Sequence, residues 1–323
     1  MYRYLQSLVL SHLPSDVCRL PSAVAFVLML GGLLPALVAQ SDPAARMLLL
    51  GATVVGRDIV AVGERGAILR SDDSGRTWRR MSAPPAATLT AVAFAPQSQR
   101  GWAVGHDATI LGTDDGGRTW TRQYQGENLE TSFLDVCALD TMSAIVVGAY
   151  GQCLATTDGG KTWTPRRPIE EDQHLNRIVA SPTGTLFIAG ERGLLLRSTD
   201  RGGHWTRLDS TYDGSFYGLL PLSGASLLAH GLRGRIYRST DNGATWQLVP
   251  VEPRVMLATG VRLRSGLIVL AGQARAFLVS RDGGQSFAPW APGLTTSIAQ
   301  LLEAPDGTLL AFGEAGVSLL PAP

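Results

Sequence analysis

The sequence predicts an all-β fold, a seven-bladed β-propeller built from four-stranded antiparallel blades. Two observations lead to this prediction: an eight-residue turn that recurs along the chain, and a set of short apolar runs that recurs with it. The aromatic residues that close the six copies of the turn stand 42, 43, 42, 41 and 41 residues apart. A near-constant period in the low forties indicates repeated units that stack, because one such unit cannot bury its own apolar face.

The repeated turn follows the pattern S/T-x-D-x-G-x-T-W. Its copies are SDDSGRTW (71–78), TDDGGRTW (113–120), TTDGGKTW (156–163), STDRGGHW (198–205), STDNGATW (239–246) and SRDGGQSF (280–287). The aspartate can accept hydrogen bonds from backbone N–H groups of its own turn, and the glycine suits a positive φ. The aspartates are Asp73, Asp115, Asp158, Asp200, Asp241 and Asp282.

The closing aromatic side chain of each turn is expected to be buried beside a neighbouring blade. These residues are Trp78, Trp120, Trp163, Trp205, Trp246 and Phe287. We interpret the turn as a structural staple for a hairpin. Calcium binding is the alternative, but each turn offers only one or two carboxylates and lacks the alternating ligands of an EF-hand.

Residues 89–124 show what one repeat contains. The β-rich runs LTAVAFA, GWAVG, ATILGT and TWTRQY are separated by PQSQR, by HD and by the repeated turn, which predicts a four-stranded meander. Residues 297–320 supply three more runs and then end without a turn of this kind. We therefore predict that residues 42–48 (DPAARML) add the missing outer strand, so that the N-terminal segment closes the ring and removes a free sheet edge.

Residues 1–39 are predicted to be a signal peptide or an N-terminal anchor, followed by a single propeller domain over residues 40–323. The apolar stretch 23–39 is preceded by Arg3 and Arg19 and interrupted by glycine and proline. Cleavage after Ala39 fits a secretory signal, and retention would give membrane association through residues 23–39. Either outcome places the propeller outside the cytoplasm, in a periplasm or on the lumen side.

Charge and motif content exclude several function classes. Residues 1–39 hold two of the 28 basic and one of the 27 acidic residues, so the remainder has 26 of each, and nucleic-acid binding is not expected. The motifs HExxH, CxxC, Walker A and GxSxG are absent, and no metal or cofactor is predicted. Cys137 and Cys153 fall on the first and third strands of one blade, about 9–10 Å apart, so we expect two buried thiols and no disulfide.

The repeat resembles the Asp-box, or BNR, motif, and nearly the whole chain after residue 45 is similar to the photosystem II assembly and stability factors among the Asp-box families. The similarity rests on a recurring segment that leads into the Asp-box. Its copies are GERGAILRSDD (63–73), GERGLLLRSTD (190–200) and GLRGRIYRSTD (231–241). Blades two, three and six depart from it, with GHDATILGTDD, GAYGQCLATTD and GQARAFLVSRD. That family includes relatives in bacteria without photosynthesis.

The resemblance implies a non-catalytic, exported scaffold or assembly factor for a membrane protein complex. Its partner would be the extracytoplasmic loop or tail of a subunit, either of photosystem II or of another envelope complex, and we expect the propeller itself to be a monomer. A purely structural envelope protein is a further alternative. No catalytic residue is predicted.

The turns between second and third strands are predicted to lie near the central channel, on the face opposite the boxes. They carry a mixed set of charged and aromatic side chains that we predict to bind the partner: Glu64, Arg65, His106, Asp107, Tyr150, Glu191, Arg192 and Arg233. The alternative is that hairpin tips are simply polar. Tyr124 and Tyr212, on the connectors between blades, are either interface residues or partly buried tyrosines, and His230 is placed at the channel mouth.

A sialidase-like or other Asp-box glycoside hydrolase, or a carbohydrate-binding propeller, is the competing interpretation. It would require three arginines converging on a substrate carboxylate beside a tyrosine–glutamate pair, for which Arg65, Arg192, Arg233, Tyr212 and Glu191 are available. The F/Y-R-I-P stretch typical of sialidases before the first box is absent, since AVGERGAILR stands there. We therefore do not predict an enzyme.

Overall fold

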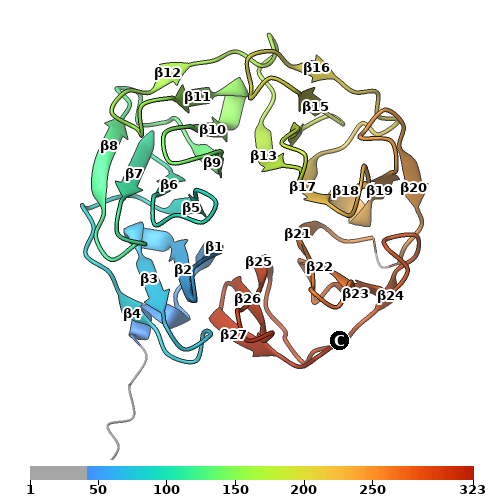
Figure 1. Cartoon of the computed structure of the whole chain (residues 1–323). Helices are drawn as coiled ribbons and strands as arrows, with labels where there is room; N and C mark the ends of the chain where they lie inside the picture. Colours follow the sequence, from blue (N-terminus) through green and yellow to red (C-terminus); the bar gives the residue numbers. More distant parts are fainter. Residues whose placement is uncertain (1–41, 253) are drawn as a thin grey trace, which may run out of the picture. The chain divides into compact units, whose positions relative to one another are not determined.

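The computed structural model describes residues 42–252 and 254–323, which lie in one compact unit, Ala39–Pro323. Seven β-sheets stand around a common centre (Figure 1). Each sheet is an antiparallel meander in which consecutive strands are neighbours; six have four strands and the last has three. The seven-bladed propeller is confirmed. The predicted leader, residues 1–39, lies outside the described residues, and among those described no helix is long and apolar enough to cross a bilayer.

The strands of each blade follow one another in chain order. Blades 1 and 2 comprise β1 (Leu49–Val55), β2 (Asp58–Gly63), β3 (Ile68–Ser71), β4 (Arg79–Arg80), β5 (Leu89–Phe94), β6 (Gly101–Gly105), β7 (Thr109–Thr113) and β8 (Thr121–Gln125). Blades 3 and 4 comprise β9 (Phe133–Ala138), β10 (Ala144–Gly148), β11 (Cys153–Thr156), β12 (Thr164–Pro165), β13 (Leu175–Ala180), β14 (Leu186–Gly190), β15 (Leu195–Ser198) and β16 (Thr206–Arg207). Blades 5 to 7 comprise β17 (Phe216–Pro221), β18 (Leu227–Gly231), β19 (Ile236–Ser239), β20 (Gln247–Val249), β21 (Leu257–Arg262), β22 (Ile268–Gly272), β23 (Phe277–Ser280), β24 (Ala288–Pro289), β25 (Ile298–Glu303), β26 (Leu309–Gly313) and β27 (Gly316–Leu320).

The core lies between blades, not within them. The second strands β6, β10, β14, β18, β22 and β26 are buried at all five positions, because both faces of a blade are covered by its neighbours. One hydrophobic cluster joins Trp102 of blade 2 to Val146 of blade 3, and another joins Phe312 of blade 7 to Leu69 of blade 1. Burial of apolar side chains between blades therefore continues around the whole ring.

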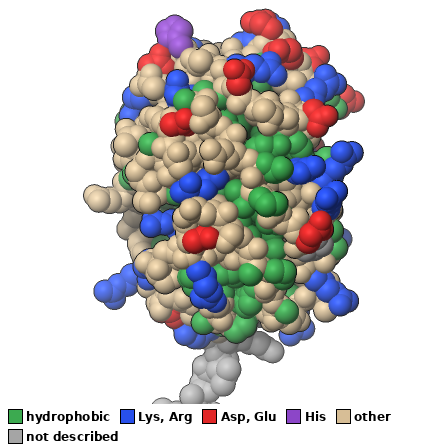
Figure 2. All heavy atoms as spheres, turned by 90° about the vertical axis from the view of Figure 1, so that its right-hand side faces the viewer, with side chains coloured by type: hydrophobic (Ala, Val, Ile, Leu, Met, Phe, Trp, Pro, Cys, Tyr) green, Lys and Arg blue, Asp and Glu red, His purple; other side chains and the backbone are tan. Residues whose placement is uncertain are grey.

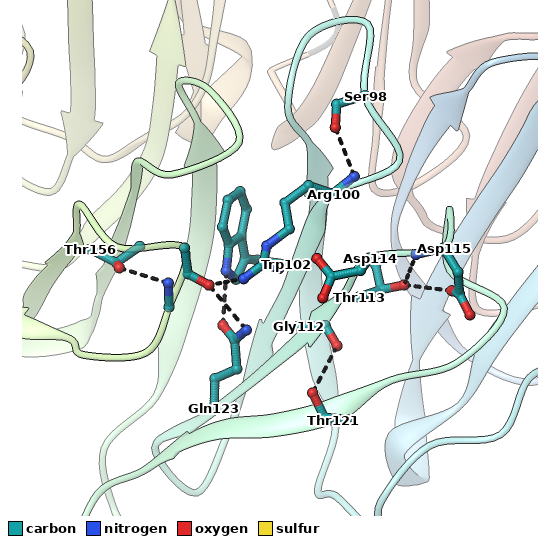
Figure 3. Close-up of polar contacts among 12 residues, drawn as sticks. Ser98, Arg100, Trp102, Gly112, Thr113, Asp114, Asp115, Thr121, Gln123 and Thr156 are labelled. Atoms are coloured by element: carbon teal, nitrogen blue, oxygen red, sulfur yellow. Dashed lines mark hydrogen bonds and ion pairs between the residues drawn. The ribbon is translucent and has the colours of Figure 1, made fainter.

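The repeated turn forms a hydrogen-bond network around its aspartate, and Figure 3 shows the part of this network in blade 2 that joins Thr113 to Asp115. Asp115 Oδ1 accepts from the Thr113 hydroxyl at 2.8 Å and from the Thr119 N–H at 2.9 Å, and Oδ2 accepts from the Thr119 hydroxyl at 2.7 Å. The Gly117 N–H donates to Thr113 Oγ1 at 3.1 Å, and Trp120 Nε1 donates to the Gly117 carbonyl at 3.1 Å. In blade 2 the turn thus satisfies its own polar groups while its tryptophan is buried. The closing aromatic residues Trp205, Trp246 and Phe287 are only partly buried, contrary to the prediction, and Trp163 Nε1 has no hydrogen-bond partner among the described residues.

The glycine of the turn lets each box approach the preceding blade. Its φ lies between 80° and 89° in all six copies, a conformation that favours glycine. A Cβ on Gly75 would come within 2.6 Å of Leu310 in blade 7, and one on Gly202 within 2.5 Å of Ile145 in blade 3. The box therefore acts as a staple inside its own blade and as a contact with the preceding one. In blade 4, His204 replaces the threonine, and its Nδ1 lies 2.6 Å from Asp200 Oδ2.

The seventh blade departs from the prediction, because residues 42–48 do not form its fourth strand. Pro43–Arg46 form a short 3-10 helix, η1, which begins after Asp42 accepts a hydrogen bond from the Ala44 N–H at 2.8 Å. Proline cannot donate to a sheet ladder, and the capping aspartate favours a turn. Ala44 and Ala45 are nevertheless buried against blade 7, where η1 contacts β27.

The two thiols of blade 3 are free and buried, as predicted. Cys137 on β9 and Cys153 on β11 pair with different residues of β10, so one strand separates them. Burial raises the pKa of the Cys153 thiol to about 12, which makes it a poor nucleophile at neutral pH.

The box carboxylates should make folding stability depend on pH in the acid range. The Thr162 hydroxyl and then the Thr162 N–H lower the pKa of Asp158 from 3.8 to about 2. As the pH falls, the unfolded chain therefore binds protons first, so stability that is complete above about pH 4 is lost toward about pH 2. We expect Asp158→Asn to have a lower Tm than wild type at pH 7 and a smaller change of Tm between pH 4 and pH 2. Thermal unfolding measured by circular dichroism gives both values.

Asp209→Asn serves as the control for this measurement, because Asp209 is exposed and belongs to no box. Its Tm should follow the wild-type dependence on pH. Superimposable curves for Asp158→Asn and wild type would contradict the role given to the box aspartate.

The contact between η1 and β27 can be tested at Gly316, which has a φ of 78°. A Cβ at this position would overlap the carbonyl oxygen of Ala45. Gly307 has a similar φ of 92° but nothing within 4 Å of its Cβ position, so Gly307→Ala is a matched control for backbone strain alone. We expect Gly316→Ala to lower the free energy of unfolding in urea by about 1–3 kcal/mol more than Gly307→Ala. It should also speed tryptic cleavage at Arg46, and equal effects of the two variants would show that the contact contributes nothing.

Candidate functional site

One face of the ring carries both the turns between second and third strands and the connectors between blades, as predicted. Backbone hydrogen bonds join the two sets: Ala108 N–H to the Thr131 carbonyl at 2.8 Å, and Gly151 N–H to the Gln173 carbonyl at 2.8 Å. We call this surface the turn face; it comprises the turns at 64–66, 106–108, 149–151, 191–193, 232–234 and 273–275 and the connectors that follow each blade. The boxes lie at the opposite ends of the strands.

The tips of these turns hold bulky side chains in an unfavourable backbone conformation. Arg65, Tyr150, Arg192 and Arg233 have φ values of 55°, 54°, 50° and 57°, in the left-handed region that favours glycine. Each such residue costs on the order of 1 kcal/mol relative to an ordinary conformation. All four side chains are exposed. The residue that follows each of them also has a positive φ, as two-residue β-hairpin turns require, so the geometry of the hairpin sets this conformation.

The carboxylates of the same turns are engaged by the backbone. Glu64 accepts a hydrogen bond from the Leu48 N–H at 3.1 Å and Glu191 from the His174 N–H at 3.0 Å. Glu314, in the corresponding turn of blade 7, accepts one from the Ser297 N–H at 3.2 Å. Each glutamate thereby ties its turn to the start of the innermost strand. The predicted mixed ring of charges therefore presents its arginines to solvent, while these glutamates face the protein backbone.

Among the described residues, the arginines at the turn tips have no acidic partner, unlike Arg167 and Arg254 on the connectors, which pair with Glu170 and Glu252. Arg65, Arg192 and Arg233 form no ion pair with any residue in 42–252 or 254–323. A fourth arginine, Arg275, is exposed in the corresponding turn of blade 6 with a φ of 63°. Arg275 was not predicted, because GQARA places arginine where blades 1, 3, 4 and 5 have glycine; alignment of the turns by their first glycine would have found it.

The other predicted residues of the turn face lie on blades 2 and 3. His106 Nδ1 is 2.8 Å from the Ser132 hydroxyl, and Asp107 is exposed at the tip. Tyr150 is 64% exposed and its ring meets that of His174 edge-on at 4.8 Å. These residues lie in the turns of blades 2 and 3, whereas the turns of blades 4 to 6 carry arginine. The face is therefore not uniform in chemistry.

The two tyrosines predicted on connectors are partly buried, and Tyr124 lies in β8 and not on a connector. Tyr124 packs against Phe133, with ring centroids 6.1 Å apart. The Tyr212 hydroxyl donates to the Leu232 carbonyl at 2.9 Å, and burial raises the pKa of Tyr212. The Glu191 carboxylate is held by the His174 N–H, as described above, so Tyr212 and Glu191 do not form the activated pair that a sialidase-like mechanism requires.

The outer side of the ring differs from the turn face. Figure 2 shows basic and acidic side chains interspersed there, with hydrophobic side chains in a band between them. Within the described part of the chain, no group of three or more His, Cys, Asp or Glu side chains is arranged to hold a metal ion.

Comparison with solved structures shows the same fold in proteins of low sequence identity. "YCF48 bound to D1 peptide" superposes with a TM-score of 0.71 at 21% identity, covering 86% of this chain and 94% of that one. "YCF48 from Cyanidioschyzon merolae" gives 0.67 at 17% identity, covering 87% and 97%. A streptogramin B lyase gives 0.75 at 13% identity, covering 87% and 95%, so the fold also occurs in an enzyme.

Comparison of the sequence identifies the family. A search of curated proteins finds no match. The family model described as photosynthesis system II assembly factor YCF48 matches residues 71–131 and 123–291, which together span about two thirds of the chain. The chain therefore belongs to the photosynthesis system II assembly factor YCF48 family.

Proposed function

We propose that this protein is a non-catalytic assembly or scaffolding factor whose turn face binds an extracytoplasmic segment of a membrane protein. The observation that carries the proposal is the set of arginines at strained, exposed turn tips without acidic partners: Arg65, Arg192, Arg233 and Arg275. Guanidinium groups form paired hydrogen bonds with carboxylates, so an acidic loop or tail is the segment that this face would select.

Membership of an assembly-factor family supports this proposal, and one family member of the same fold is known bound to D1 peptide. The positions of the arginines also matter, because they lie on blades 1, 4, 5 and 6. A segment that contacts Arg192, Arg233 and Arg275 can follow three neighbouring blades, and one that also contacts Arg65 must extend across the mouth of the ring. Binding in this manner needs a rigid platform and a monomeric ring with this face open, and it needs no chemical step.

Charge reversal at the turn face should abolish partner binding without unfolding the ring. We expect Arg65→Glu/Arg192→Glu/Arg233→Glu to recover at least about 10-fold less partner than wild type, because each change replaces an attraction by a repulsion. The measurement is affinity purification of the tagged protein from its own membranes, with bound proteins quantified by mass spectrometry. Raising the salt concentration should weaken wild-type capture in the same direction.

The matched control is Arg57→Glu/Arg80→Glu/Arg281→Glu, which makes the same change in net charge at exposed arginines outside the turn face. This variant should capture the partner as wild type does. Equal capture by wild type and the turn-face variant, with both folded by circular dichroism, would refute the proposed binding surface.

We also propose that residues 1–39 direct export, so that the propeller works in a periplasm or on the lumen side. The support is the basic N-terminal region followed by the apolar stretch 23–39. Fractionation of cells should recover the full chain outside the cytoplasm and a variant lacking residues 1–39 inside it. Recovery of both forms in the cytoplasm would contradict export.

A further inference from the structure

The central channel contains a cavity that is separate from the turn face. Its volume is about 510 Å³, and it is lined by residues from the innermost strand of every blade, β1, β5, β9, β13, β17, β21 and β25. Figure 1 shows these strands at the centre of the ring. Small residues such as Gly51, Ala91 and Gly260 form much of the wall and leave the channel wide. A cavity of this size falls within the range of small-molecule sites.

Three charged residues line this cavity: Asp135, Arg177 and Arg262. Asp135 is 5% exposed, and its Oδ2 accepts a hydrogen bond from the Ile178 N–H at 2.9 Å. The same oxygen lies 3.4 Å from Nε of Arg177. The single carboxylate of the channel is therefore already engaged by blade 4.

Positive charge exceeds negative charge inside the channel. Arg262 is exposed and makes no ion pair with any residue in the described ranges, and Arg177 has only Asp135 as an acidic partner there. Burial raises the pKa of Asp135, and the nearby Arg177 only partly opposes this shift. His230 does not lie at the channel mouth as predicted: it is 1% exposed, donates from Nδ1 to the Leu257 carbonyl at 3.1 Å, and has its pKa lowered to about 4 by burial, so it is neutral at pH 7.

The two arginines lie at different depths. The innermost strands start at the turn face, where Glu64 binds the residue before β1. Arg177 is the third residue of β13, whereas Arg262 is the last residue of β21 and lies toward the box side. An elongated ligand that enters from the box side would meet Arg262 first and Arg177 farther in.

We propose that the central channel binds a small organic anion with two carboxylate groups, which pair with Arg262 at the rim and Arg177 within. Each guanidinium offers several N–H donors in a geometry that matches a carboxylate. Small uncharged side chains around them admit the carbon chain of the ligand, and a surplus of positive charge in a concave site favours anions. This inference does not depend on partner binding at the turn face.

Titration calorimetry of the purified protein with succinate, at an ionic strength held constant with sodium chloride, tests the site. We expect saturable binding to wild type and a loss of roughly 10-fold or more in affinity for Arg262→Gln. Asp135→Asn should bind succinate more tightly, because it removes the only negative charge of the channel while an amide oxygen can still accept from Ile178. If Asp135 had a purely structural role, Asp135→Asn would not increase the affinity for succinate.

Arg281→Gln is the control, since it removes the same charge from an exposed box position of the same blade as Arg262. It should bind succinate as wild type does. The proposal is overturned if wild type shows no saturable binding, if Arg262→Gln and Arg281→Gln bind equally, or if a folded Asp135→Asn binds more weakly. Partner capture by Arg262→Gln should stay at the wild-type level, which separates this site from the turn face.

Discussion

The close contact between each box and the preceding blade is the constraint on which the rest of the ring depends. A single four-stranded meander leaves apolar side chains on both faces, so it is stable only between two others. The box aspartate holds its turn in one conformation, and the turn glycine then lies against the neighbouring blade, as Gly75 does against Leu310. The same geometry repeated at six turns sets the angle between blades without any metal or disulfide among the described residues.

Because the boxes and the inter-blade clusters fix the ring, the opposite face is free to carry residues that do not stabilise the fold. Three predicted arginines at turn tips and Arg275 have a left-handed backbone conformation. A rigid ring tolerates the free-energy cost of this conformation. The glutamates beside them, such as Glu64, hold the turns to the innermost strands. Anchoring to the backbone and exposure of a cation to solvent are thus divided between neighbouring residues of the same short turn, as in Glu64 and Arg65.

Much of the fold could be predicted from the sequence, but the candidate sites only in part. The seven blades, the antiparallel meanders, the buried cysteines and the face on which the turns lie all follow from local patterns. The outer strand predicted for residues 42–48 was wrong, because Asp42 and Pro43 favour a 3-10 turn over a strand. The turns and connectors lie on one face, as predicted. The sequence predicted a ring of mixed charge there, whereas in the structure the glutamates accept hydrogen bonds from the backbone.

The sequence by itself determined the number of blades and the role of the repeated turn, because these depend on a constant period and on hydrogen bonds between residues at most five positions apart. Tertiary structure alone decided which polar side chains are already engaged. Glu64 and Leu48 are 16 residues apart, and Asp135 and Ile178 are 43 residues apart on different blades. Such partners meet only when the ring closes, so the free arginines of the turn face and the excess positive charge of the channel become visible only in the folded protein.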